Sequence, residues 1–376
     1  MVVGVLTTSY PRHADDYAGS FVGDRVRALL AEGHAVEVFA AADTRATTRS
    51  VEGALTITRI GLDPQGGEPL FYGDGGPEAL ERGGARAWWQ ALRFSTDLAT
   101  AVRARLPHLD ALEAHWLVPC VAVAATVAPQ KPLRAFSHSG DVALLERLPA
   151  GDALARTLAA RIAGADLLFV TDDLRRRFAA LVGRAIGRVQ HLAAPADLFP
   201  PITPASRQAA RAALGLAGPT VIAVGRLVPI KGFHRLIDAC AEAAAIGGQG
   251  LPLTAIIVGD GPERGALAAA ARVAGVRLTL PGWVPRSNLA HWLHAADAYA
   301  QPSLALPSAR REGLPVATLE ALAVGLPVIA SDEPGLRELD VDKNRLLLIE
   351  TKNRRAFGDA LIGTLSRNCV GVVTAV

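Results

Sequence analysis

Residues 1–40 of this 376-residue chain are MVVGVLTTSYPRHADDYAGSFVGDRVRALLAEGHAVEVFA. The apolar run Val2–Leu6 is typical of a strand that is buried on both faces. After a polar loop, apolar residues recur at helical spacing over residues 21–30, and Gly33 is a typical helix C-cap. Val36–Ala40 predicts the next strand. This order of strand, loop, helix and strand is the beginning of a doubly wound parallel sheet.

Further apolar runs extend the same pattern along the chain. In the first half they predict strands at Ala111–Ala114, Leu133–Ser137 and Leu167–Thr171. A second series begins with a strand at Thr220–Val224 and continues with helix 233–246, strand 253–258, helix 263–274, strand 276–280, helix 287–295, strand 297–301, helix 316–324 and strand 327–330. The predicted fold class is therefore α/β, with two Rossmann-like, doubly wound parallel sheets.

The segment 195–204 separates the two series and is too rich in proline for a helix. Chains longer than about 250–300 residues usually split into domains. We therefore expect an N-terminal domain over residues 1–197 and a C-terminal domain over residues 198–376. Because ligands of open parallel sheets bind at the carboxyl ends of the strands, we expect the two domains to face a central cleft.

The composition excludes several classes of protein. A formal net charge of +3 with 20% charged residues is unlike an acidic disordered chain or a nucleic-acid-binding tail. The cysteines Cys120, Cys240 and Cys369 form no Cys-x-x-Cys pair, which argues against a disulfide scaffold or a zinc ribbon and for a reducing compartment. The N-terminus has no basic leader, and the chain has no unbroken apolar run of 18 residues. These features predict a cytoplasmic protein.

One helical pattern concentrates positive charge. Arg175–Arg177 and Arg184 recur beside large apolar residues within the segment 174–184. Such a pattern is typical of a helix that contacts an anionic membrane surface, but also of a solvated helix face. Peripheral contact with the cytoplasmic face of a membrane is one interpretation of this segment, and a solvated helix is the other.

The most informative segment is residues 311–331, REGLPVATLEALAVGLPVIAS. Pro315 suits the first position of a helix, which places Glu312 just ahead of the helix and Glu320 inside it. Eight helical residues rise ~12 Å, so a molecule that contacts both carboxylates is elongated. Backbone amides at the helix N-terminus favour an anion between them. A hexose at Glu312, phosphates at the helix end and a ribose at Glu320 fit this arrangement; the alternative is a capping Glu312 and a solvated Glu320.

Two cations follow the strand Thr220–Val224. Arg226 and Lys231 lie in a loop that Gly232 closes before the next helix. Two fixed positive charges suit a diphosphate, whose negative charge grows as its bond to carbon breaks. Loops at strand ends carry functional residues more often than other surfaces do, although both cations can also be simple surface charges.

Two further segments follow predicted strands. Gly259-Asp-Gly-Pro-Glu-Arg-Gly265 misses the dinucleotide fingerprint by one residue, so it predicts either a turn against which a nucleoside packs or a purely structural turn. Phe136-Ser-His138-Ser-Gly-Asp141 and His115-Trp116 each place a histidine at a strand end. A histidine there can act as a base or bind a sugar hydroxyl, but a single histidine is more often structural.

Several familiar sites are absent from the sequence. There is no Gly-x-x-x-x-Gly-Lys-Ser/Thr loop and no Gly-x-Ser-x-Gly elbow. His291 and His294 lack the glutamate of a zinc protease motif. Asp340 and Asp342 lie in an acidic stretch that we interpret as a solvated loop. A metal-independent enzyme without a cofactor is the simplest interpretation.

Together these motifs resemble glycosyltransferase family 4, a family of retaining enzymes with the GT-B fold, of bacterial type. The specific part is Glu312-x7-Glu320 within Glu-Gly-Leu-Pro and Leu-Glu-Ala-Leu-Ala-x-Gly-x-Pro-Val. Gly-Arg226-Leu-x-x-x-Lys231-Gly and Val-Gly-Asp-Gly-Pro-Glu-Arg support it. The N-terminal half is similar to the family through its Tyr10-Pro11 loop, Gly19-x-Phe-Val, His115-Trp and His138-x-x-Asp141.

The resemblance implies that a nucleoside diphosphate-sugar, used as a cosubstrate, is bound mainly by the second domain. Glu312 would bind the hydroxyls of the sugar, Glu320 the ribose, and Arg226 and Lys231 the departing diphosphate. Donor binding is expected at Gly19, Gly225, Arg226, Lys231, Gly282, Trp283, Val284, Glu312, Gly313, Leu314, Pro315, Val316 and Glu320. Catalytic roles are expected for Arg226, Lys231, Glu312 and His138, the last contacting the sugar from the first domain.

The expected activity is transfer of a sugar to a hydroxyl of a glycan, a lipid-linked acceptor or a small molecule, with retention of anomeric configuration. A two-domain nucleotide-sugar epimerase and a catalytically degenerate nucleotide-sugar-binding protein are the alternatives. The C-terminus departs from the family pattern. Residues 354–365 predict one helix and residues 368–376 a strand-like tail, so we expect the crossover helix of the family to be short or missing.

Overall fold

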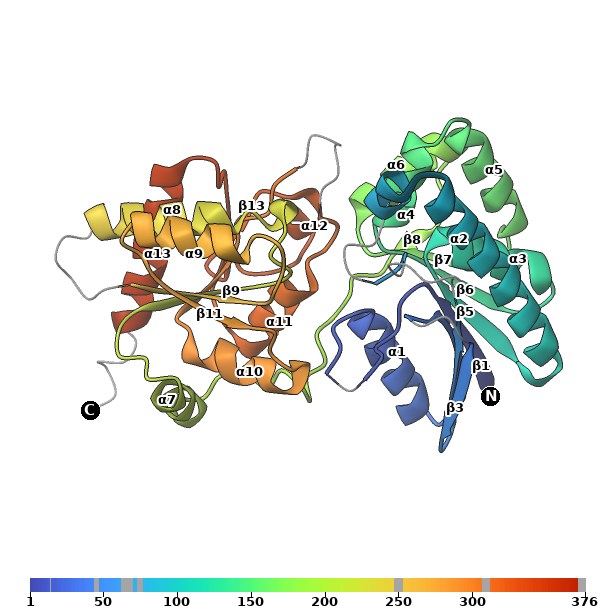
Figure 1. Cartoon of the computed structure of the whole chain (residues 1–376), viewed down its shortest axis with the longest axis horizontal. Helices are drawn as coiled ribbons and strands as arrows, with labels where there is room; N and C mark the ends of the chain where they lie inside the picture. Colours follow the sequence, from blue (N-terminus) through green and yellow to red (C-terminus); the bar gives the residue numbers. More distant parts are fainter. Residues whose placement is uncertain are drawn as a thin grey trace. The chain divides into compact units, whose positions relative to one another are not determined.

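The computed structural model of the chain describes residues 1–13, 15–43, 47–61, 70–72, 77–246, 253–305 and 312–370. The chain divides into two compact units, Met1–His191 and Leu192–Val376. The boundary expected after residue 197 falls a short distance beyond this division. Each unit has its own parallel sheet and its own helices, as Figure 1 shows. The predicted fold class, two doubly wound α/β domains, is confirmed.

The first unit contains a sheet in the strand order β3-β4-β2-β1-β5-β6-β7-β8. Its strands are β1 (Val2–Thr7), β2 (Ala35–Ala41), β3 (Thr48–Glu52), β4 (Leu55–Ile60), β5 (Ala111–His115), β6 (Leu133–Ser137), β7 (Asp166–Phe169) and β8 (Arg188–Val189). Its α-helices are α1 (Ser20–Ala31), α2 (Pro77–Arg105), α3 (Ala122–Val127), α4 (Gly140–Arg147), α5 (Gly151–Arg161) and α6 (Asp172–Val182). All neighbouring strands run parallel except β3, which pairs antiparallel with β4 at the edge.

The second unit contains a parallel sheet in the order β11-β10-β9-β12-β13-β14. Its strands are β9 (Thr220–Val224), β10 (Thr254–Val258), β11 (Arg277–Gly282), β12 (Ala298–Gln301), β13 (Val328–Ser331) and β14 (Leu346–Ile349). Its α-helices are α7 (Pro204–Ala213), α8 (Phe233–Ile246), α9 (Arg264–Val273), α10 (Arg286–Ala295), α11 (Val316–Val324), α12 (Pro334–Arg337) and α13 (Arg354–Val370).

Each sheet has a point at which the chain changes direction across it. In the first unit the chain runs outward from β1 to β2 and β4, and then returns to the other side of β1 as β5. In the second unit it runs from β9 to β10 and β11, and then returns beside β9 as β12. Loops that follow the two strands at such a point diverge and leave a crevice for ligands. The loops after β1, β5, β9 and β12 are therefore the places to look for a site.

Apolar side chains from the strands and the covering helices form a separate core in each unit. In the first, Val3, Val5 and Val38 of the central strands pack with Val22 and Val26 of α1. Burial of each such side chain contributes about 1.5–3 kcal/mol. The spacing that predicted α1 from the sequence is thus the spacing that turns one side of the helix towards the sheet.

The C-terminal segment corrects the prediction for the end of the chain. The helix expected at residues 354–365 continues to Val370 as α13, so a strand-like structure is wrong for residues 368–370. Residues 371–376 lie outside the described part of the chain. Phe357, Leu361 and Leu365 recur every four residues and belong to the buried core that α8 also contributes to, which explains why this segment is helical. In the described part of the chain, no helix has the length and apolar content needed to cross a membrane.

Candidate active site

The loops after β9 and β12 bring together two side chains that lie far apart in the sequence. Lys231 ends a single 3-10 turn after β9, and Glu312 precedes α11 on the β12 side. The Nζ atom of Lys231 lies 2.9 Å from Oε2 of Glu312. Both side chains are partly buried. The structure thus places two of the predicted catalytic residues in direct contact, while Arg311 lies outside the described residues.

Glu320 is paired with an arginine that the sequence analysis did not find. It lies inside α11 with a side chain that is 5% exposed, and it accepts hydrogen bonds from Nη2 of Arg286 at 2.8 Å and from Nε at 3.0 Å. The interpretation of Glu320 as a solvated side chain is therefore wrong. A signal for the partner was present: Arg286 is the first residue of α10, where the helix dipole disfavours a cation unless an anion is near.

The N-terminus of α11 lies between Glu312 and Glu320, the two glutamates of these ion pairs, in the sequence. Pro315 is the N-cap residue and Val316 begins the helix. Leu314 and Pro315 are buried, whereas Gly313 and Val316 are partly exposed. The first amides of a helix have no acceptor within the helix, so this terminus can bind an anion. The binding of phosphate at this terminus, between a sugar at Glu312 and a ribose at Glu320, stays a prediction.

A buried chain of hydrogen bonds lies beneath α11. The hydroxyl of Tyr299 donates to Oε1 of Gln301 at 2.7 Å, and Nε2 of Gln301 donates to Oγ of Ser303 at 2.7 Å. Thr318 of α11 also donates to Gln301, at 3.4 Å. Burial, and then the negative charge of Glu320, raises the pKa of Tyr299. The neutral phenol is therefore a stable donor to Gln301 within β12, and the bond from Thr318 links this strand to α11.

The glycine-rich turn after β10 supports the loop that carries Arg226. A Cβ atom on Gly259, which has φ +135°, would lie 1.9 Å from the carbonyl oxygen of Gly225. The carbonyl oxygen of Asp260 accepts a hydrogen bond from the amide of Leu227 at 2.9 Å. This turn therefore shapes the backbone on both sides of Arg226, a partly buried residue. These contacts favour the structural interpretation of the turn.

The segment Gly282-Trp283-Val284 begins at the last residue of β11. The carbonyl oxygen of Gly282 accepts a hydrogen bond from the amide of Gly259 at 2.9 Å. Val284 is buried, and the side chain of Trp283 is 40% exposed. The predicted base-contacting segment is thus joined through the Gly259 turn to the Arg226 loop in the same unit.

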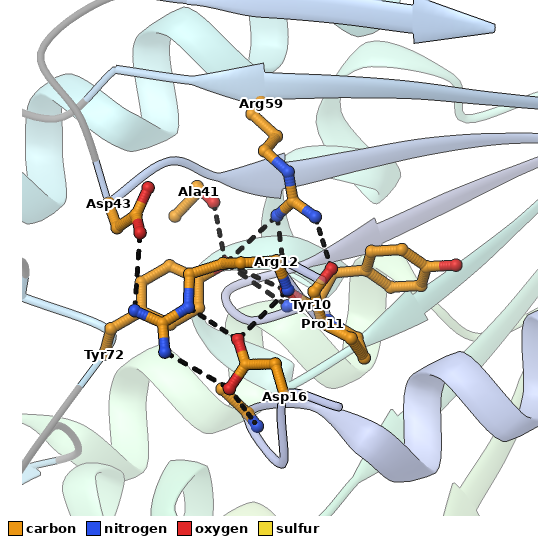
Figure 2. Close-up of polar contacts among 9 residues, drawn as sticks. Tyr10, Pro11, Arg12, Asp16, Ala41, Asp43, Arg59 and Tyr72 are labelled. Carbon is orange, nitrogen blue, oxygen red and sulfur yellow. Dashed lines mark hydrogen bonds and ion pairs between the residues drawn. The ribbon is translucent and has the colours of Figure 1, made fainter. Parts of the chain in front are cut away.

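In the first unit, the loop after β1 is held by side chains from β4 and from the segment 70–72 (Figure 2). Arg59 donates hydrogen bonds to the carbonyl oxygens of Tyr10 (3.2 Å) and Pro11. The hydroxyl of Tyr72 contacts the backbone of Tyr10 and donates to the carbonyl oxygen of Ala41 at 2.9 Å. The loop is therefore fixed at its beginning.

The same loop is also fixed further along. Asp16 accepts hydrogen bonds from the backbone amide of Arg12 at 3.0 Å, from Nε of Arg12 at 2.5 Å and from the amide of Ala18 at 3.1 Å, as Figure 2 shows in part. Gly19 follows with φ +67°, and a Cβ atom there would lie 2.2 Å from the carbonyl oxygen of Ser9. Glycine is required at this position by the packing of the loop itself.

The two strand-end histidines of the first unit also contact each other. Nδ1 of His115, the last residue of β5, lies 2.9 Å from Nε2 of His138, which follows β6. Asp141 fixes the backbone that follows each histidine, because its carboxylate accepts from the amide of Leu117 at 2.8 Å and from the amide of Ser139 at 3.2 Å. The sequence placed both histidines at strand ends, but their contact depends on strand register and was not predicted.

Comparison with known proteins supports an assignment of family. Residues 218–367 match the family described as "Glycosyl transferases group 1". The D-inositol 3-phosphate glycosyltransferase of Frankia alni is 30% identical over 364 residues, which cover 91% of this chain and 84% of that protein. The chain belongs to the group 1 glycosyltransferases. The predicted membership of family 4 is confirmed.

Other relatives of this glycosyltransferase match over shorter stretches. The D-inositol 3-phosphate glycosyltransferase of Jonesia denitrificans is 34% identical over 183 residues, 46% of this chain and 42% of that protein. A GDP-mannose-dependent alpha-(1-6)-phosphatidylinositol monomannoside mannosyltransferase of Mycobacterium tuberculosis is 32% identical over 217 residues, 55% of each chain. The glycosyltransferase thus matches less than two thirds of the length of these two relatives.

Solved structures confirm the GT-B fold of the glycosyltransferase. Sucrose-phosphate synthase from Thermosynechococcus elongatus has a TM-score of 0.69 at 19% identity, over 98% of this chain and 90% of that chain. Anabaena Alr3699/HepE in complex with UDP and glucose has a TM-score of 0.67 at 20% identity, over 98% and 91%. In the described residues of the glycosyltransferase, no group of three or more His, Cys, Asp or Glu side chains is arranged to hold a metal ion.

Proposed function

We propose that this glycosyltransferase transfers a sugar from a nucleoside diphosphate-sugar to a hydroxyl of a glycan, a lipid-linked acceptor or a small molecule. The observation that carries the proposal is the two ion pairs, Lys231–Glu312 and Arg286–Glu320, whose glutamates lie before and after the N-terminus of α11 in the sequence. The names of two relatives support this reaction. One is a putative colanic acid biosynthesis glycosyltransferase, and the other is a GDP-mannose-dependent mannosyltransferase.

Each charged group has a proposed role in this reaction. Glu312 accepts hydrogen bonds from sugar hydroxyls, and Glu320 accepts them from the ribose. Lys231 and Arg226 bind the diphosphate and stabilise its growing charge, a contribution of a few kcal/mol by analogy with oxyanion stabilisation. The contact between Lys231 and Glu312 supports this division, because it places a cation and a hydroxyl acceptor at neighbouring positions, as the phosphate and sugar of one donor require.

The reaction is proposed to retain the anomeric configuration and to need no divalent metal. The cations of the β9 loop supply positive charge for the diphosphate without an ion. An oxygen of the leaving group can then take the proton of the acceptor hydroxyl. NMR of the product tests retention, and transfer at an unchanged rate in the presence of EDTA tests metal independence.

A transfer assay decides between this function and its alternatives. Purified protein is incubated with a panel of nucleotide sugars, with and without candidate acceptors. Transfer that requires acceptor supports the proposal. A donor that is isomerised without acceptor indicates an epimerase, and tight donor binding without turnover indicates a degenerate binding protein. Glu312→Gln is expected to lower the transfer rate at least 100-fold, with the circular dichroism spectrum unchanged; turnover at the wild-type rate contradicts the assignment of Glu312.

The buried thiols Cys120 and Cys240 are free, which supports a reducing, cytoplasmic location.

Contact with a membrane is also proposed, but through a different helix from the one expected. The arginines of α6 are paired with acids: Arg175 and Arg176 with Asp172, and Arg177 with Glu146. These pairs leave this face with little net charge, and among the described residues α6 has no exposed large apolar side chain that could enter a lipid surface.

The exposed side of α2 has the chemistry of a lipid contact. Trp88, Trp89 and Leu92 are 43%, 49% and 64% exposed, an unusual concentration of large apolar side chains on one helix. Arg86 is exposed beside them, and the guanidinium of Arg93, which also pairs with Asp97, lies 5.5 Å from the centre of the Trp89 ring. Indoles and arginines together suit the boundary between anionic headgroups and acyl chains. We call the two tryptophans, Leu92 and the two arginines the α2 patch and propose that it contacts anionic lipid.

A further inference from the structure

The two histidines at the strand ends of the first unit form one hydrogen-bonded pair. Their ring planes differ by 13° and their ring centres are 5.2 Å apart, and Nδ1 of His115 lies 2.9 Å from Nε2 of His138. These values fit an N–H···N bond that lies in the plane of both rings. The register of the sheet fixes the separation, since His115 is paired with Phe136 on the neighbouring strand, two residues before His138.

The pair is enclosed by aromatic rings. His115 is 2% exposed and stacks on Phe136, with ring centres 4.7 Å apart. His138 is 8% exposed, with Phe21 at 4.5 Å and Trp116 at 5.0 Å between ring centres. The two outer nitrogens, Nε2 of His115 and Nδ1 of His138, are buried and have no hydrogen-bond partner in the described structure. A buried polar atom without a partner is costly, which indicates that a polar ligand completes this site.

The number of protons on the pair limits what it can offer such a ligand. Burial lowers the pKa of both rings, so each is neutral and carries one proton near pH 7. If the shared proton is on Nδ1 of His115, then His138 holds its own proton on Nδ1 and is a donor towards the ligand. If the shared proton is on Nε2 of His138, then its Nδ1 is an acceptor and His115 is protonated on Nε2. Both rings therefore have the same tautomer: Nδ1–H in the first state and Nε2–H in the second.

We propose that His115 is a positioning residue that lets His138 present either a donor or an acceptor at Nδ1 to a hydroxyl of the bound sugar. A carboxylate or a backbone carbonyl in the place of His115 could only accept a hydrogen bond. His138 would then keep its proton on Nε2, and its Nδ1 would always be an acceptor. The imidazole of His115 both donates and accepts, so the ligand selects the tautomer of the pair. This inference rests on the proposed function, because it assumes that His138 contacts a sugar.

The structural part of the proposal is tested by NMR of the protein labelled with ¹⁵N-histidine, which identifies the protonated nitrogen of each ring. We expect His115 and His138 to share one tautomer, both Nδ1–H or both Nε2–H, in the free protein and with UDP-glucose or GDP-mannose added. Different tautomers on the two rings overturn the proposal. This measurement needs no turnover, so it tests the histidine pair even if the protein transfers no sugar from any donor. Absence of transfer would contradict the proposed function alone.

The functional part is tested by a double-mutant cycle on the transfer rate. His115→Phe keeps the ring against Phe136 but removes the hydrogen bond, and is expected to lower kcat/KM about tenfold. His115→Asn can still donate and accept near the Nδ1 position, and is expected to stay within about twofold of wild type. In a His138→Phe background, His115→Phe should have no further effect. An equal loss in both backgrounds means that His115 does not act through His138 and overturns the proposal. Thermal unfolding of each variant shows whether it is folded.

Discussion

At the scale of single residues, the buried acid Glu320 of α11 depends on Arg286, the partner that the sequence analysis missed. Glu320→Leu would remove the carboxylate from beside Arg286, whose side chain is 11% exposed, and loss of one partner of a buried ion pair typically costs about 3–5 kcal/mol in the free energy of unfolding. We expect a loss of about 3 kcal/mol in urea denaturation. Asp97→Asn is the control, because the Arg93–Asp97 pair is exposed and its loss should cause no measurable change. Equal stabilities for the two variants would contradict the role of the Arg286 contact.

The histidine pair predicts how stability depends on pH. Burial lowers the pKa of His138 to about 3 and holds that of His115 well below its usual range, whereas both titrate near 6.5 in the unfolded chain. The unfolded state therefore binds more protons, and the free energy of unfolding falls as the pH drops below about 6.5. The expected slope is up to about 1.4 kcal/mol per pH unit for each ring.

Urea denaturation between pH 7 and pH 5 measures this slope. The double variant His115→Phe/His138→Phe is the control, since it removes both groups and should flatten the dependence over that range. The carboxylates whose pKa the fold lowers, such as Asp166, affect stability mainly below this range. An unchanged slope in the double variant would show that other groups carry the pH dependence.

At the scale of single elements, the turn after β10 provides a test of backbone packing. Gly259→Ala places a methyl group against the carbonyl of Gly225, and we expect a loss of about 2 kcal/mol in stability together with reduced transfer, because the Arg226 loop must move. Gly275→Ala is the matched control. It also has positive φ (+68°), but its Cβ atom would meet nothing within 4 Å. If both variants lose the same stability, backbone strain rather than the Gly225 contact explains the effect.

The packing of α13 is tested separately. Leu361 is fully buried in the core of the second unit, and Leu361→Ala is expected to cost about 3 kcal/mol in unfolding by urea. Asp359→Ala, an exposed position on the same helix, is the control and should change stability little. A small effect of Leu361→Ala would mean that α13 is not part of this core.

Elements were predictable from the sequence where apolar spacing and local breakers agree. The helices expected at 233–246 and 316–324 have the bounds of α8 and α11, and the turns beside them contain glycine or proline. The pair β3–β4 was not predicted, because Thr48–Glu52 is an exposed edge strand without an apolar pattern. Helix α2 was also missed, since Gly84 has non-helical φ and ψ and interrupts its pattern.

The candidate site could be predicted only in part, for a similar reason. Glu312, Lys231 and His138 follow strands or precede a helix, positions that the sequence pattern marks. The residues that contact them cannot be identified from the sequence pattern in the same way. The contacts Lys231–Glu312 and His115–His138 join residues that follow different strands, and Arg286–Glu320 joins two helices. All three therefore depend on the strand order and register of each sheet.

At the scale of the whole molecule, the α2 patch predicts binding to lipid. We expect the protein to sediment with vesicles that contain phosphatidylglycerol and to bind less to neutral phosphatidylcholine vesicles, because arginine favours anionic headgroups. Trp88→Ser/Trp89→Ser should reduce the bound fraction several-fold. Arg175→Gln/Arg176→Gln on α6 is the control and should bind as wild type does. Absence of binding to anionic vesicles would contradict the proposed contact.

The contact between Lys231 and Glu312 has a consequence for discrimination among small molecules in the cell. Lys231 and Glu312 are each other's counterion, so an isolated phosphate must compete with Glu312 for the ammonium group, and a free sugar must compete with Lys231 for the carboxylate. An intact nucleotide sugar brings an anion and hydroxyls together and can satisfy both groups when they separate. The protein is therefore expected to ignore abundant fragments of its cosubstrate and to respond to the complete molecule.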